Sequence, residues 1–165
     1  GRPSLRFTDR SRAMIELANQ YAIEQNRSEK DRIRSFRLSG YIWGRHLIQP
    51  RHVLAAIALG PKGVGYHAIL ACGANPDQIA VLACNVSSST HLRDHKEKLP
   101  LDHDTERLVV DAIHEASALG HDWVGTEHFL LAFFRSKDRK CRRALKVAEI
   151  TAENVQAFIR SNGAQ

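Results

Sequence analysis

The chain repeats one pattern of residues at a spacing of 76 positions. Residues 47–58 read LIQPRHVLAAIA and residues 123–134 read WVGTEHFLLAFF. In each segment, polar residues lead into a histidine, His52 or His128, which an apolar run follows. Further pairs continue the match: Ala68 with Ala144, Ile69 with Leu145, and Ile79 with Val155. A repeat of this kind limits the fold to two copies of one unit packed against each other.

Each copy opens with an amphipathic helical pattern, but these patterns match at a different spacing. FTDRSRAMIELANQYA starts at Phe7 with Thr8 as its expected cap, and LDHDTERLVVDAIHEASALG starts at Leu101 and ends on Gly120, a residue typical of helix termination. The two helices match at an offset of 94. The first copy therefore carries 18 extra residues (94 minus 76) after its first helix, at about 26–43.

The pattern predicts an all-α domain made of two pseudo-symmetric repeats, each with four helices. Asn75, followed by Pro76, and its counterpart Thr151 are expected to cap the fourth helix of each repeat. Evidence for strands is thin. A unit of about 65 residues buries too little surface to be secure alone, so the repeats should share a core. The expected boundaries are repeat one at about 7–86, a polar linker at 87–100, and repeat two at about 101–163.

Composition narrows the class of protein further. Charged residues make up 25% of the chain and hydrophobic residues 43%, which is typical of a globular protein, and no apolar run approaches the ~20 residues of a membrane span. The three cysteines show no C-x-x-C spacing, which indicates reduced thiols in a cytoplasmic compartment. The net charge of +6 arises in residues 1–51, which hold 11 Lys and Arg against 5 Asp and Glu.

Three segments together resemble a known family: FTDRSRAMIELA (7–18), GVGYHAIL (63–70) and GHDWVGTEHFLL (120–131). They are similar to the double Clp repeat, the amino-terminal domain of the ClpC and ClpA type of protein-unfolding ATPases, over roughly residues 7–160. The resemblance implies a domain without chemistry of its own that recruits protein clients or adaptors of a Clp machine. It also implies a Clp ATPase, on the same chain or another, as a partner.

The T-E-H block, residues 126–128, has a structural and a functional interpretation. Thr126 can cap the second helix of repeat two, and Glu127 in the first turn suits the helix dipole. The resemblance implies instead that this glutamate forms part of a pocket for phosphorylated arginine. Repeat one has Arg51 at the matching position, and Asp102 and Asp104 would repel a phosphate. The capping interpretation is therefore favoured.

No residue pattern supports catalysis, a cofactor or a metal. His52 and His128 are expected to be structural, each ring packing in the core or between the repeats while one nitrogen satisfies a backbone carbonyl, because a metal site needs three or four convergent ligands. LGPKGVGYH lacks the Gly-Lys-Ser/Thr of a phosphate loop and is interpreted as the turn before a third helix. The chain is not expected to be an enzyme.

The insertion, NRSEKDRIRSFRLSGYIWGRH at 26–46, is the most individual segment. Its mixture of arginines and aromatic residues is typical of a protein interface, of a surface for single-stranded nucleic acid, or of a loop folded back on the core. Protein recognition is preferred, and binding of nucleic acid or another polyanion is the alternative. A second basic stretch, 135–146, fits a solvated helix face. The candidate partner-binding residues in the insertion are Arg32, Arg34, Phe36, Arg37, Tyr41 and Trp43.

Overall fold

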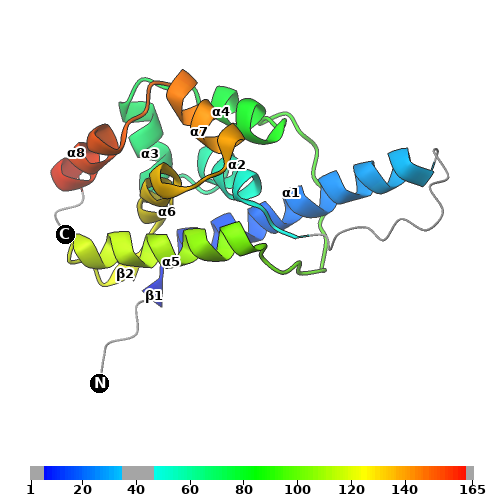
Figure 1. The fold of residues 1–165 in the computed structure, drawn as a ribbon, viewed down its shortest axis with the longest axis horizontal. Coiled ribbons are helices and arrows are strands. Elements are labelled where there is room, and N and C mark those ends of the chain that lie inside the picture. The colour runs from blue at the N-terminus through cyan, green and yellow to red at the C-terminus, as the bar shows by residue number, and fades with distance from the viewer. Residues whose placement is uncertain (1–5, 35–46, 163–165) are drawn as a thin grey trace.

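A computed structural model describes residues 6–34 and 47–162, without the side chains of residues 27–34. The regular elements of the described part are helices apart from two strands of two residues each, which confirms the all-α prediction (Figure 1). The helices are α1 (Asp9–Arg34), α2 (Pro50–Leu59), α3 (Val64–Ala71), α4 (Pro76–Cys84), α5 (His103–Ala118), α6 (Thr126–Ala132), α7 (Arg139–Val147) and α8 (Ala152–Asn162), with a 3-10 turn η1 (Phe133–Arg135) after α6.

The helices fall into two matching sets of four, α1–α4 and α5–α8. The helix pair α2 and α6 starts at Pro50 and Thr126, and the pair α4 and α8 starts at Pro76 and Ala152, so both pairs keep the spacing of 76. The first helices of the two repeats differ in length: α1 has 26 residues and α5 has 16. Residues 26–34 of the insertion therefore continue α1, which extends well beyond the other helices in Figure 1.

Short parallel pairings cross-link the two repeats. Strand β1 (Arg6–Phe7), just before α1, pairs with β2 (Trp123–Val124), just before α6. A single bridge joins Ile48, just before α2, to Leu101, just before α5. Each pairing connects the first helix of one repeat to the second helix of the other. The sequence did not predict these pairings, because two residues are too few to show the alternation of a strand.

A buried hydroxyl reinforces each pairing. Ser11 Oγ donates to the carbonyl oxygen of Val124 at 2.8 Å, and Thr105 Oγ1 donates to that of Ile48 at 2.8 Å. Ser11 and Thr105 are themselves 94 positions apart, so the two bonds are related by the repeat. Both side chains are fully buried, where a hydrogen bond is costly to leave unmade. The seam between the repeats is therefore held at two equivalent points.

Helices α2 and α6 form the centre of a single shared core. Eight of the ten residues of α2 and six of the seven residues of α6 are buried. Helix α2 packs on α1 and α4, and α6 packs on α5 and, across the seam, on α3. No single described helix has the length and apolar composition to cross a membrane; α2 and α3 meet that test only as a pair bent by 77°.

The linker lies along α1 and is fixed to it by side chains. Asn19 donates to the carbonyl of Glu97 at 2.7 Å and accepts from the N–H of Leu99 at 2.8 Å. Gln20 contacts both backbone groups of His95, each at 3.0 Å. These bonds fix the linker as part of the folded surface.

The helix ends use the residues that the sequence predicted. Asn75 accepts from the N–H of Asp77 at 2.9 Å, and Thr151 accepts from that of Asn154 at 3.1 Å, which confirms both caps. Gly120 ends α5 with a φ of 72°. At the ends of α3 and α7, the left-handed position is taken by Gly73 (φ 76°) and, 76 positions later, by Glu149 (φ 58°).

Substitutions at these two equivalent positions should have opposite effects on stability. The left-handed conformation is strained for a residue with a Cβ, so Glu149→Gly should raise the free energy of unfolding by about 0.5 to 1 kcal/mol. Gly73→Ala should lower it by about 1 kcal/mol, since a Cβ at Gly73 meets no atom within 4 Å and only the backbone strain remains. Urea unfolding followed by circular dichroism measures both changes. Stabilisation by Gly73→Ala would contradict this account of the helix ends.

Candidate functional site

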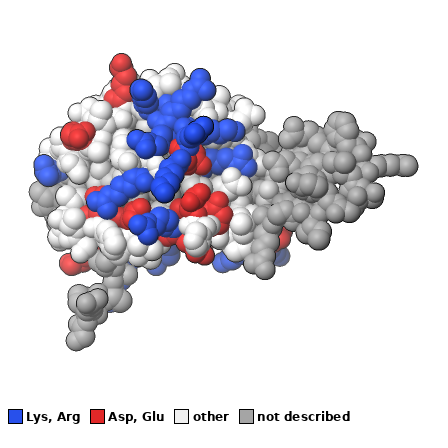
Figure 2. Space-filling model, viewed as in Figure 1, with Lys and Arg blue, Asp and Glu red and all other residues white. Residues whose placement is uncertain are grey.

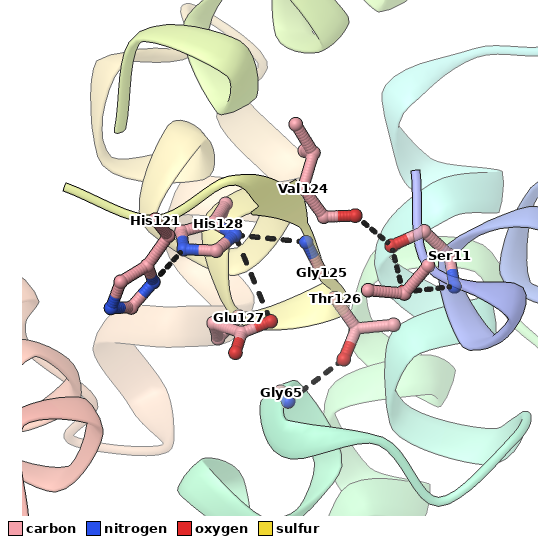
Figure 3. A network of polar contacts seen from close by, with 9 residues as sticks. Ser11, Gly65, His121, Val124, Gly125, Thr126, Glu127 and His128 are labelled. Atoms are coloured by element: carbon pink, nitrogen blue, oxygen red, sulfur yellow. Dashed lines mark hydrogen bonds and ion pairs between the residues drawn. The ribbon is translucent and has the colours of Figure 1, made fainter. Parts of the chain in front are cut away.

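The second helix of each repeat begins with the same histidine contact, and Figure 3 shows the one in repeat two. The N–H of Gln49 donates to His52 Nδ1 at 2.9 Å, and the N–H of Gly125 donates to His128 Nδ1 at 2.8 Å. Both rings are about 1% exposed. The prediction that the ring nitrogen binds a backbone carbonyl was therefore wrong for this nitrogen, which accepts from an N–H. The physical reason is that the first N–H groups of a helix are the ones left without partners.

The second ring nitrogen ties each helix to a neighbour. Since Nδ1 accepts a hydrogen bond, the proton lies on Nε2, which donates to Gln25 Oε1 from His52 (2.9 Å) and to His121 Nδ1 from His128 (2.8 Å). Burial lowers the pKa of His52 to about 3 and that of His128 to about 4. These values include a smaller contribution from Arg51 to the lowered pKa of His52 and from His121 to that of His128. Both rings are thus neutral structural groups.

Thr126 caps a helix of the other repeat. The sequence predicted a cap on its own helix, which is wrong because Gly125 occupies that position. Thr126 Oγ1 instead accepts from the N–H of Gly65, in the first turn of α3, at 2.9 Å. A Cβ added to Gly63 or Gly65 would collide with Thr126, so these glycines permit the close approach. The glycine-rich segment is the turn before α3, as predicted.

Glu127 is folded back on the start of its own helix. Its side chain is 12% exposed, and Oε1 lies 3.8 Å from His128 Nδ1. Burial raises the pKa of this carboxyl. Asp102 is also engaged, because its Oδ1 accepts from the N–H of Thr105 at 2.7 Å as the cap of α5, whereas Asp104 is exposed. The groups considered for phosphoarginine are thus mostly occupied by contacts within the fold.

The structure places only part of the insertion's candidate residues. Arg32 and Arg34 lie in the last turn of α1. Phe36, Arg37, Tyr41 and Trp43 lie outside the described residues. Their role in binding a partner therefore stays a prediction.

A surface hollow of about 620 Å³ lies where the repeats meet the linker. We call it the seam groove. Apolar side chains of Ile15, Ile48 and Leu101 contribute to its lining, and Ile48 is 2% exposed. The remaining lining is largely polar and charged, so the groove offers both apolar contact and hydrogen bonds. The seam groove is formed by Ile15, Glu16, Asn19, Gln20, Ile48 and residues 94–101.

The described residues show neither a metal-ligand cluster nor a nucleophile paired with a histidine. Residues 6–26 and 47–162 contain no group of three or more side chains placed to hold a metal ion. None of their hydrogen bonds joins a serine or cysteine to a histidine, the pairing that activates a nucleophile. Burial raises the pKa of Cys84 to about 11 and that of Cys141 still further, which makes both thiols unreactive.

The fold and these contacts define a class: an all-α tandem-repeat domain whose most distinctive motif residues hold its helices together within and between the repeats. A model of the Clp repeat N-terminal domain matches residues 44–148. The chain belongs to this family. No curated protein matches its sequence.

Solved structures show the same fold at low sequence identity. The N-terminal domain of the Hsp104 protein from Candida albicans aligns with a TM-score of 0.63 and 16% identity, covering 97% of this chain and 93% of that one. The N-terminal domain of the caseinolytic protease associated chaperone ClpD from Arabidopsis thaliana gives 0.60 and 15%, with coverages of 97% and 96%. A structure from a study of a malarial protein secretion system gives 0.69 and 14%, with coverages of 97% and 99%.

Removing the Thr126 hydroxyl should weaken the contact between the repeats. Thr126→Val keeps the shape of the side chain but leaves the buried N–H of Gly65 without an acceptor, so the free energy of unfolding should fall by about 1 to 2 kcal/mol. Thr126→Ser, which keeps the hydroxyl, is the matched control and should lose less. Urea unfolding measures both. If the valine variant is as stable as the wild type, the Thr126 hydroxyl does not stabilise the contact between the repeats.

The buried histidines should make the fold sensitive to mild acid. Between pH 6.5 and the folded-state pKa values of about 3 and 4, the unfolded chain binds protons that the folded chain does not, so stability falls as the pH falls. Each histidine should lower the free energy of unfolding by up to about 1.4 kcal/mol for each pH unit below its unfolded pKa. The raised pKa of Glu127 acts in the opposite direction, because its folded form binds a proton more readily.

The measurement is urea unfolding between pH 5 and 7.5 on the wild type and on His52→Gln with His128→Gln. Glutamine keeps an acceptor at the capping position but does not titrate. The double variant should therefore show a flatter dependence of stability on pH. An unchanged slope would mean that these rings do not carry the acid sensitivity.

Proposed function

We propose that this chain is a non-catalytic recognition domain that binds protein clients or adaptors for a Clp-type ATPase or protease system. The observation that carries the proposal is that the motif residues serve the fold while a separate groove is open to a partner. The motif residues His52, His128 and Thr126 are all engaged within the fold, whereas the seam groove is open at the surface. Membership of the Clp repeat N-terminal family supports the same function.

The linker supports binding of an extended client segment. The backbone groups of His95, Glu97 and Leu99 bond to side chains of α1. In an extended chain the backbone N–H and C=O groups of successive residues point to opposite edges, so those of Lys96 and Lys98 are expected to face away from α1. No described hydrogen bond uses them, and both residues are exposed. An extended peptide can add to such an edge as a strand does.

The shared core supports a rigid platform. Because the pairings of β1 with β2 and of Ile48 with Leu101 cross the seam, the groove's two sides are fixed to one body. Pre-organised surfaces bind with a smaller entropic cost. The proposal also includes a reducing, cytoplasmic compartment, which the three free cysteines support.

The proposal predicts selective binding of unfolded protein through the seam groove. The purified chain should bind fluorescein-labelled, reduced and carboxymethylated lactalbumin and should not bind native lactalbumin, as measured by fluorescence anisotropy. Glu16→Trp places an indole over the groove from an exposed position on α1 and should weaken binding by about fivefold or more, because it excludes the client's side chains.

Gln78→Trp is the matched control, because it adds the same ring at an exposed position on α4 outside the groove. It should bind like the wild type. Absence of binding to the unfolded protein would contradict the function, and equal loss in both variants would contradict the assignment of the groove.

A further inference from the structure

Helix α7 presents an unusual concentration of positive charge (Figure 2). We call its five exposed cations the basic ridge. They form five like-charged pairs at spacings of three or four residues, which destabilise a helix, and α7 contains no acidic residue. Asp138, just before the helix, is occupied as its cap, since it accepts from the N–H of Cys141 at 2.9 Å. The basic ridge consists of Arg139, Lys140, Arg142, Arg143 and Lys146.

The fold itself does not require these charges. The equivalent helix of repeat one, α3, reads VGYHAILA and contains no lysine or arginine. At the spacing of 76, the positions of Arg142, Arg143 and Lys146 correspond to a tyrosine, a histidine and a leucine. Cations in the first turn of α7 also oppose its helix dipole. A charge pattern that disfavours its own helix and is absent from the structural twin indicates a role outside the fold.

A hollow adjoins the ridge. It has a volume of about 730 Å³ and lies between η1, α7 and α8. Its floor is apolar, formed by Phe133, Phe134, Leu145 and Ile150, of which only Phe134 is more than slightly exposed. The volume is large enough for one or two big side chains. We call it the α7–α8 hollow.

The rim of the hollow carries charges of both signs on different elements. Arg142, Arg143 and Lys146 of the ridge line it from α7. Glu149, in the turn after α7, and Glu153, in the first turn of α8, also line it. No described acidic side chain lies within ion-pairing distance of these three cations. A ligand that complements this rim places its negative charge over α7 and an apolar group in the hollow.

We propose that the basic ridge and the α7–α8 hollow form a docking site for an acidic protein segment that carries a large apolar side chain. The carboxylates of the segment pair with Arg142, Arg143 and Lys146, and its apolar side chain enters the hollow above Phe134 and Leu145. The inference rests on the proposed function in that the partner is a protein, and it adds the partner's chemistry and a surface separate from the seam groove.

The same observations disfavour nucleic acid as the occupant. The two glutamates of the rim would repel a continuous phosphate backbone. Single strands also bind through exposed aromatic rings on which bases stack, whereas Phe133 is fully buried and Phe134 half-buried. Helix α7, which carries the ridge, is nine residues long, about 14 Å, which matches a short peptide.

The test uses the whole chain and a fluorescein-labelled peptide of four glutamates followed by leucine and phenylalanine. Fluorescence anisotropy should show binding that weakens when the glutamates are replaced by glutamine and also when the two apolar residues are replaced by serine. Arg142→Glu with Arg143→Glu should weaken binding by about tenfold or more, because it reverses the charge that faces the peptide. Glu153→Lys should strengthen it by removing a repulsive carboxylate.

Lys62→Glu with Arg160→Glu is the matched control, since it makes the same change in net charge at exposed positions outside the hollow. It should leave peptide binding within about twofold of the wild type, because distant exposed charges are screened by salt. Circular dichroism and thermal unfolding verify that each variant is folded. If the control and ridge variants lose peptide affinity equally, the effect arises from net charge alone and the proposal is overturned.

Two further outcomes overturn the proposal. One is that single-stranded DNA of random sequence binds the wild type more tightly than the peptide does, and that this DNA binding is lost in the ridge variant. The other is absence of peptide binding. The ridge variant should retain its binding of unfolded lactalbumin through the seam groove, so failure of the docking site is distinguishable from failure of the proposed function.

Discussion

The structure depends on two equivalent hydrogen bonds that cross between the repeats. Ser11 in α1 and Thr105 in α5 each donate to the carbonyl that precedes the second helix of the opposite repeat. A short parallel pairing accompanies each bond. Because these groups are buried, separating the repeats would leave them without partners as well as exposing the shared apolar core. Two units that are each too small to be stable alone are thereby joined into one rigid body.

The histidines and Thr126 belong to the same framework. His52 and His128 accept from the backbone at the start of the central helices, and Thr126 supplies a cap to α3. The two repeats solve this capping problem differently. Helix α3 starts after Gly63, which has no side chain, so the cap comes from the other repeat, whereas α7 is capped by its own Asp138. The counterpart of Thr126 in repeat one is Pro50, which has no hydroxyl to donate or accept.

Differences between the repeats also locate the candidate binding surfaces. Residues shared by both repeats mostly build the core and the helix ends. The linker and the cations of α7 occur in only one place, and both lie at the surface beside a hollow. Where the repeat keeps a residue, folding explains it; where the chain departs from the repeat at an exposed position, recognition of another molecule is the better explanation.

The sequence alone determined the helical class, the two repeats and the caps at Asn75 and Thr151, because these follow from periodicity and from local hydrogen bonds within a few residues. It could not reveal that Thr126 caps α3, since Gly65 is 61 positions away. Nor could it join His121 to His128, because the turn after Gly120 brings them together only once α6 is packed. Tertiary structure decided these contacts, and with them the hollows, because they depend on how helices distant in the chain pack against one another.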